Sequence, residues 1–202
     1  MKTLYLDCGM GAAGDMLAAA LLELLDDPES FIGQMNDLEI PGVEIKKRKA
    51  FKCGISGTQM SVIVQGIEEK SEDVKTDHHQ HSHIENHSHE GEHSHHSYTG
   101  ILEIQNLISN LRLPEEVKKD IREVYDLLAE AESSVHGKPV EQIHFHEVGT
   151  MDALVDITAV CWLMHLISPE RMVVSPVHVG SGHVRCAHGI LPVPAPAASL
   201  ST

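Results

Sequence analysis

A histidine-rich, low-complexity stretch at residues 68–97 divides this chain and most constrains how it can fold. It consists mainly of Glu, Asp, Ser, His and Lys, with too few apolar side chains to bury a core of its own. The sequence therefore predicts a disordered insert between residues 1–67 and residues 98–202. We expect these two segments to form one α/β (α+β) domain of short strands and several amphipathic helices.

Apolar periodicity and turn residues predict the elements on both sides of the insert. A short apolar run at residues 4–6 predicts a strand, and alternating polarity in residues 43–53 and 58–64 predicts a hairpin with residues 54–57 as its loop. A further strand is predicted at residues 171–179, before a Gly- and Pro-rich end. Helices are expected where apolar residues recur at helical spacing, at residues 16–25, 30–38, 101–111, 115–135 and 152–167.

Charge and composition exclude several classes of function. The 30 acidic and 15 basic residues give a net charge of -15, which argues against binding to nucleic acid or to anionic lipid. Aromatic residues make up 3% of the chain, so a base-stacking surface is not expected. The four cysteines show no short pairing, no apolar run is long enough to cross a bilayer, and the N-terminus does not read as a signal peptide. These features predict a soluble, cytoplasmic protein.

A glycine-rich turn follows the first predicted strand. Gly9, Gly11 and Gly14 match a G-x-G-x-x-G spacing between a strand and a helix, where backbone N–H groups can bind phosphate. Asp7 and Asp15 flank the turn and would repel a phosphate unless a cation lay between them. Three interpretations stay open: a tight structural turn, a carboxylate–cation site and a plain phosphate site.

The insert contains nine of the 16 histidines of the chain. Imidazole binds nickel, copper and zinc, and a flexible string of imidazoles can wrap an ion without a preformed site. A solvated linker is the alternative, but this density of histidine favours capture or storage of metal. The candidate ligands are His78, His79, His81, His83, His87, His89, His93, His95 and His96.

A third candidate site lies around the start of the last expected helix. His144 and His146 point to the same side of an extended segment. Asp152 and Asp156 share one face of the helix, where like charges repel unless a cation or a donor lies beside them. With Glu147, two imidazoles and up to three carboxylates converge there. The alternative is separate roles: a core histidine, a helix cap and a solvated carboxylate.

The fourth candidate site combines histidine, cysteine and arginine near the C-terminal end. His178, His183 and His188 lie within eleven residues together with Cys186. Histidine and cysteine ligands suit a borderline-soft ion such as Ni²⁺ or Zn²⁺. Arg185 could hold a phosphate or a carboxylate. The alternative is a glycine-rich turn with a buried structural thiol.

Taken together, these motifs resemble the LarC nickel-insertion family. Residues 4–16 are similar to its N-terminal signature, residues 144–149 with Asp152 and Asp156 to its central motif, and residues 180–197 to its third. The resemblance covers nearly the whole chain except the histidine tract and the last few residues. It implies a nickel chelatase of the lyase class. Such enzymes insert Ni(II) into pyridinium-3,5-bisthiocarboxylic acid mononucleotide and form the nickel-pincer nucleotide cofactor of lactate racemase.

The resemblance also implies cofactors and partners. The family reaction depends on CTP hydrolysis, and CTP with a divalent cation (Mn or Mg) is held by a C-terminal domain that we expect to be absent here. In that case the present chain alone need not be active. The expected partners are the acceptor mononucleotide, the apoprotein of lactate racemase, the chain's own C-terminal half and further copies in a homo-oligomer.

From these motifs we assign three groups of site residues. The expected catalytic residues are His144, His146, Glu147, Asp152 and His188. The expected cofactor-binding residues are Gly9, Gly11, Gly14 and Arg185. Besides the tract, metal is expected at Asp7, Asp15, His144, His146, Cys186 and His188.

Two other functions are alternatives to nickel insertion. A nickel store or metallochaperone without turnover is the main alternative, since the histidine tract would serve it equally well. A zinc hydrolase that uses His144, His146 and Glu147 is disfavoured, because a helical H-E-x-x-H motif is absent.

Overall fold

The computed structural model describes residues 1–68, 99–145, 148–186, 189–196 and 198. The histidine tract, His146, Glu147 and His188 therefore lie outside the described residues. The side chains of Arg185 and Cys186 lie outside them too, although the backbone there is described. Within these ranges the fold is a mixture of helices and short strands in small sheets, which confirms the predicted mixed α/β class.

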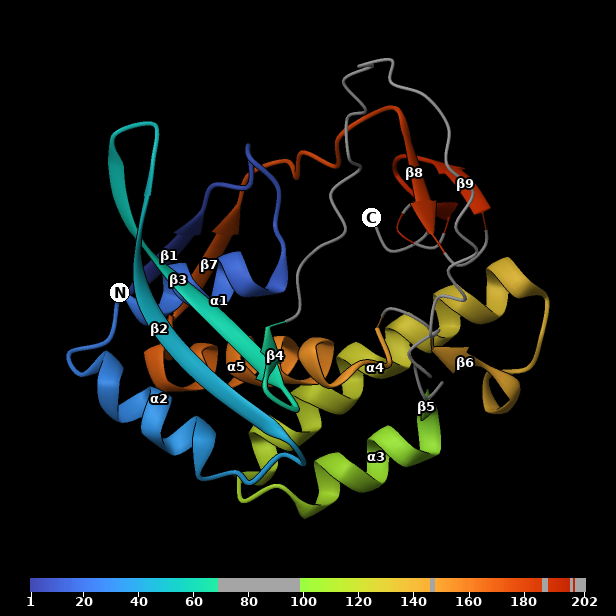
Figure 1. Cartoon of the computed structure of the whole chain (residues 1–202), viewed down its shortest axis with the longest axis horizontal. Coiled ribbons are helices and arrows are strands. Elements are labelled where there is room, and N and C mark those ends of the chain that lie inside the picture. The colour runs from blue at the N-terminus through green and yellow to red at the C-terminus, as the bar shows by residue number, and fades with distance from the viewer. Residues whose placement is uncertain (69–98, 146–147, 187–188, 197, 199–202) are drawn as a thin grey trace, which may run out of the picture.

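Two parallel strands join the two ends of the fold. β1 (Thr3–Leu6) pairs with β7 (Arg171–Val174), with Thr3 opposite Arg171 and Leu6 opposite Val174. Parallel neighbours need a crossover connection, and here most of the chain lies between them. The carboxyl ends of both strands consequently meet at one edge, as Figure 1 shows for the dark blue and orange arrows.

A long antiparallel ribbon crosses the molecule and contacts several helices. It consists of β2 (Val43–Lys52), β3 (Ile55–Val64) and the short β4 (Ile67–Glu68), and its tip extends away from the helices (Figure 1). The predicted four-residue loop is wrong, because the strands continue to a two-residue turn at Cys53 and Gly54. Both residues have positive φ, 51° and 79°, which suits the tight turns that follow strand twist.

The helices match their predicted positions to within three residues at each end. They are α1 (Gly14–Leu22), α2 (Pro28–Asn36), α3 (Ile101–Asn110), α4 (Glu115–His136) and α5 (Met151–Ile167), with a 3₁₀ turn at Val140–Gln142. Helix α2 begins with proline in its first turn, and the Asp27 side chain accepts a hydrogen bond from the Ser30 N–H at 3.0 Å. Helix α4 ends at Gly137 with φ of 61°, the conformation that favours glycine.

The last part of the chain differs most from expectation. The strand predicted at residues 171–179 ends at Val174, because β1 offers only four residues to pair with and Pro176 has no N–H to donate. A hairpin of β8 (His183–Cys186) and β9 (Gly189–Pro192) follows, which the sequence analysis did not predict. The other short pair, β5 (Thr99–Gly100) with β6 (His144–Phe145), confirms an extended backbone at His144.

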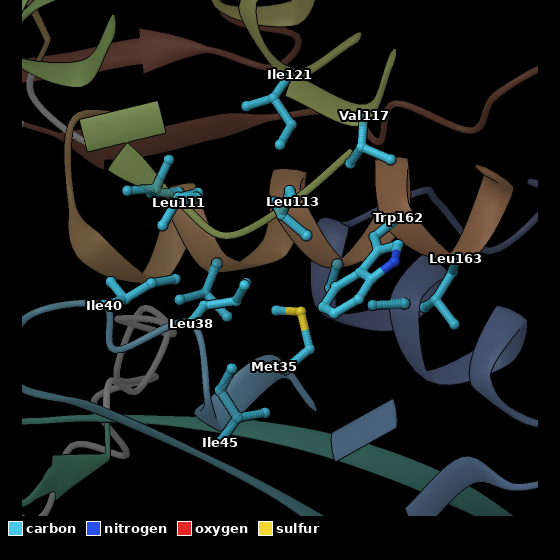
Figure 2. Packing of buried hydrophobic residues seen from close by; sticks show 14 of the residues in the cluster. Met35, Leu38, Ile40, Ile45, Leu111, Leu113, Val117, Ile121, Trp162 and Leu163 are labelled. Atoms are coloured by element: carbon cyan, nitrogen blue, oxygen red, sulfur yellow. The ribbon is translucent and has the colours of Figure 1, made fainter. Parts of the chain in front are cut away.

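One hydrophobic core joins the helices to the ribbon. Leu111 and Leu113, from the connection between α3 and α4, lie between side chains of α4 and side chains around Met35 (Figure 2). The only tryptophan, Trp162 of α5, packs on Phe31 of α2 with ring centroids 5.3 Å apart. None of the helices in the described part of the chain has the length and apolar character that crossing a bilayer requires.

Candidate functional site: the junction of α1 and α5

Two loops leave the same edge of the β1–β7 pair and are hydrogen-bonded to each other. The Cys8 N–H donates to Ser175 Oγ at 2.8 Å, and the His178 N–H donates to the Cys8 carbonyl at 3.0 Å. In parallel α/β sheets ligands bind at the carboxyl ends of the strands. A functional site is therefore expected at this edge of the β1–β7 pair.

The glycine-rich turn satisfies its own N–H groups. The Gly9 N–H donates to Asp7 Oδ1 at 3.0 Å, and the Gly11 N–H donates to the Cys8 carbonyl at 3.0 Å. Gly11 has φ of +100°, a conformation that other residues rarely adopt. Because these two donors are used within the turn, the geometry is that of a tight structural turn and leaves neither N–H free for a phosphate.

Helix α1 begins without a side-chain cap of its own. Its N-cap residue is Ala13, which has no side chain that can accept a hydrogen bond from the first turn. Asp156 of α5 lies beside this helix start, where the backbone of Asp15 acts to lower the pKa of its carboxyl group. Gly14 is needed for this approach, since a Cβ at position 14 would lie 2.7 Å from Asp156 Oδ2.

Asp156 lies among other carboxylates. Burial, then the charge of Asp152, then the charge of Asp15 raise the pKa of Asp156 to about 7, although the bond from the Asp15 backbone opposes this shift. Asp156 Oδ1 is buried and has no hydrogen-bond partner among the described residues. Among the ion pairs formed by described residues, none includes Asp15 or Asp156. Negative charge is therefore concentrated around Asp156 at this junction.

Tyr125 of α4 carries a buried hydroxyl on which the charge of Asp156 acts. Its side chain is fully buried and packs on Phe145 with ring centroids 5.9 Å apart. Within the part of the chain that the structure describes, its hydroxyl has no hydrogen-bond partner. Burial and the nearby Asp156 charge both raise the pKa of the phenol far above its usual range. The sequence analysis missed Tyr125. The burial of Tyr125 could have been predicted from its position in the series Val117, Ile121, Tyr125. The spacing of four residues in this series places the phenol on the core face of the helix.

The structure brings together only part of the predicted site. Asp15 and Asp152 meet around Asp156, which the sequence analysis treated as a companion of Asp152 without assigning it a role. His144 lies exposed in β6, opposite Gly100. Among the described residues, no three His, Cys, Asp or Glu side chains are placed to hold one metal ion directly. Asp7 is described, and its Oδ1 accepts the Gly9 N–H within the turn. The remaining predicted ligands lie where side chains are not described, so their assignment stays a prediction.

Gly149 shows why the central motif contains a glycine. A Cβ at position 149 would lie 2.8 Å from the Phe145 Cβ and 3.0 Å from the Phe145 carbonyl oxygen. Thr150 then caps α5, since its hydroxyl accepts a hydrogen bond from the Ala153 N–H at 3.3 Å. This tight turn places Asp152 and Asp156 on the first turns of α5, where they face α1.

Comparison with known proteins agrees with these motifs. A family model described as "Nickel insertion protein" matches residues 4–200. Relatives named pyridinium-3,5-bisthiocarboxylic acid mononucleotide nickel insertion protein occur in Geobacillus kaustophilus (37% identical), Clostridium acetobutylicum (39%) and Akkermansia muciniphila (35%). The matches cover 98%, 98% and 99% of this chain, but only 44%, 48% and 45% of those relatives.

The chain thus spans less than half the length of these curated relatives. No solved structure matches it. The family model nevertheless covers nearly every residue, including the strand, the glycine turn and both helices of the junction. On that basis the chain belongs to the nickel insertion protein family.

Proposed function

We propose that this chain is the nickel-handling part of an enzyme that inserts Ni(II) into pyridinium-3,5-bisthiocarboxylic acid mononucleotide. The family match over residues 4–200 and the names of the relatives support this proposal. The structural observation that carries it is the close approach of carboxylates where α1 begins against α5. One of the two reactants of such an enzyme is a divalent metal cation.

The electrostatics of the junction fit the metal ion. The carboxylates of Asp15, Asp152 and Asp156 favour a cation, and Asp15 follows β1 at the edge where parallel sheets bind ligands. The histidine tract would raise the local concentration of nickel. The ion would then pass through histidine, cysteine and carboxylate ligands to the thiocarboxylate sulfurs and a ring carbon of the acceptor.

Turnover in the complete protein is proposed to depend on CTP with Mn or Mg, and to supply the cofactor to the apoprotein of lactate racemase. The test is to incubate this chain with acceptor, Ni(II) and CTP, alone and with the remainder of a full-length relative supplied in trans. Mass spectrometry should detect a nickel-bearing mononucleotide when both parts are present, and the product should activate apo lactate racemase.

The same experiment separates an enzyme from a nickel store. A store would bind metal in every mixture and yield no nickel-bearing mononucleotide, even with the remainder present. A zinc hydrolase of the H-E-x-x-H type has no support in the structure, since His144 lies in a strand. Formation of product by this 202-residue chain alone would contradict the expected need for a C-terminal domain.

A further inference from the structure

β1 and β7 form an unusually small parallel sheet. Among the described residues, each of the two strands pairs only with the other. Purely parallel sheets occur almost only with both faces covered, and their strands are near-continuous apolar runs. β7 has such a sequence, since Met172, Val173 and Val174 follow Arg171, yet none of its residues is buried. The sequence of β7 therefore suits a central strand, while its surroundings in the described chain are those of an edge strand.

The most exposed apolar side chains of β7 lie on the core side of the sheet. Met172 stands opposite Leu4, and Val174 stands opposite Leu6. Paired residues of neighbouring strands direct their side chains to the same face, and Leu4 is buried in the hydrophobic core while Leu6 packs against it. Met172 and Val174 nevertheless remain 52% and 46% exposed. The core layer thus covers this face at β1 and stops short at β7.

The backbone of β7 also has an open side. The N–H groups of Arg171 and Ser175 donate to carbonyls at the two ends of β1, so the odd-numbered residues of this strand face β1. Backbone groups alternate in direction along a strand, so the N–H and C=O groups of Met172 and Val174 face the other way. In the part of the chain that the structure describes, no third strand bonds to them there. An edge of this kind is a template for pairing with a further strand.

We propose that the open side of β7 receives a third β-strand, supplied by the part of the full-length family protein that lies outside this chain. The curated relatives match over less than half of their own length, so more than half of each is available to supply it. A strand fits both open features at once, because its backbone bonds to the edge while alternate side chains cover the exposed face. This inference depends on family membership and not on nickel insertion.

Two other occupants fit the edge less well. The histidine tract has few apolar side chains to cover Met172 and Val174. A second copy of the chain carries the same net charge of -15, so two copies repel each other. An edge with only two open residues offers few bonds to offset the entropy lost when separate molecules associate. A strand within the same polypeptide does not bear that cost, because its effective concentration is high.

Hydrogen exchange in this chain and in the full-length Geobacillus kaustophilus relative tests the proposal. Mass spectrometry with fragmentation of the peptides resolves single amides. In this chain, the amides of Met172 and Val174 should exchange rapidly, whereas those of Val173 and Ser175 are bonded to β1 and should exchange slowly. In the matching strand of the relative, every amide should be slow, and the outward-facing ones should be slower by about a hundredfold than here.

Fast exchange at alternate amides of the relative's strand would overturn the proposal, because the edge would then be open in the complete protein. Faster protection of Met172 and Val174 in this chain alone as its concentration rises would also overturn it, since a second copy would then cover the edge. Neither measurement involves turnover, so a failure of nickel insertion would leave both results unaffected.

Overlapping peptides that cover the rest of the same relative identify the strand. One of them should bind the 202-residue chain and slow exchange at Met172 and Val174. Met172→Lys and Val174→Lys put a charge on the open side of β7 and should weaken this binding about tenfold. Tyr5→Lys is the matched control, because Tyr5 is 60% exposed on the other strand and points to the opposite face, so it should bind like the parent. Binding that Tyr5→Lys weakens and the two β7 variants do not would place the strand elsewhere and contradict the proposal.

Discussion

Gly14 and Asp156 approach each other more closely than any larger residue at position 14 would permit. A Cβ there would lie 2.7 Å from both the Cβ and Oδ2 of Asp156, and 3.0 Å from its Cγ. The contact joins the first turn of α1 to the second turn of α5. It explains why the strand–turn–helix motif at the N-terminus and the acidic pair of the central motif work as one structural unit.

Gly14→Ala tests this contact. Alanine is the better helix former, so the substitution would stabilise an ordinary helix position. Here we expect a loss of about 1–3 kcal/mol in the free energy of unfolding, because the added methyl overlaps the Asp156 side chain. Urea denaturation of the variant and the parent measures this loss.

Gly33→Ala provides the matched control for that measurement. Gly33 lies within α2, and nothing is within 4 Å of the position a Cβ would take. The Gly33→Ala substitution should therefore stabilise the protein by about 0.5–1 kcal/mol. Equal effects of the two substitutions would contradict the proposed role of Gly14.

Asp156 should make the metal-free protein less stable at high pH. Its pKa is raised from 3.8 to about 7, so the native state holds this proton more tightly than the unfolded state does. The native state therefore loses stability as pH rises from about 4 to about 7, and the loss is complete above that range. Asp156→Asn removes this dependence. The free energy of unfolding of the variant minus that of the parent should therefore be about 1–2 kcal/mol larger at pH 8 than at pH 5. This figure allows for solvent screening of a half-buried group.

That comparison needs a chelator and a control for the other titrating groups. Asp120→Asn keeps the same chemistry at an exposed position and should follow the parent at both pH values. Parallel pH curves for Asp156→Asn and the parent would show that the carboxyl ionises normally.

Deleting residues 78–96 should remove most of the nickel that the chain binds at pH 7.5, because this segment supplies nine imidazoles. Binding by the parent should weaken toward pH 5.5, since protons compete for imidazole near its pKa of about 6.5. Calorimetry gives the stoichiometry. An unchanged number of bound ions in the deletion variant would rule out capture by the tract.

Alanine at His146 or Asp152 should have the reverse effect in the complete protein. Most nickel would still bind to the tract, but insertion would be abolished, because these residues are proposed to belong to an ordered site on the acceptor's path. Cofactor formation is measured at saturating nickel, with folding checked by circular dichroism. If both variants fold and insert nickel at the parental rate, the central motif is structural and the reactive site lies elsewhere.

The turn at the tip of the long ribbon offers a test of backbone strain. Cys53 has φ of 51°, which asparagine tolerates and β-branched residues do not. Cys53→Asn should preserve or improve stability, whereas Cys53→Val should cost about 1–2 kcal/mol. Thermal denaturation of the two variants beside the parent decides this, and equal melting temperatures would show that the tip is not strained.

Local patterns predicted the helices well because each has its own signals. Proline in the first turn of α2 and the left-handed Gly137 after α4 are visible in the sequence and set those ends in the structure. The hairpin β2–β3 was also predicted, but its turn was not. Cysteine is not a usual residue for a positive φ, so the preference for Asn-Gly type turns gave no indication of Cys53.

Long-range pairing was harder to predict. The end of β7 at Val174 depends on the length of β1, which no pattern within residues 171–179 records. The same holds for the site. The sequence placed Asp152 and Asp156 on one helix face, but it did not show that this face lies against the first turn of α1. Tyr125 was overlooked because a tyrosine at helical spacing reads as an ordinary core residue.

The parallel pairing of β1 with β7 also bears on when the protein can assemble during synthesis. β1 is translated well before its partner strand β7, and the Cys8–Ser175 bond spans 167 positions. Contacts of such high sequence separation form slowly, since the loop between them must close first. β1 and the glycine turn that follows it therefore remain unpaired until α5 and β7 have been translated. A ribosome stalled before residue 171 would hold a nascent chain whose helices can fold while the carboxyl edge of the sheet is still missing.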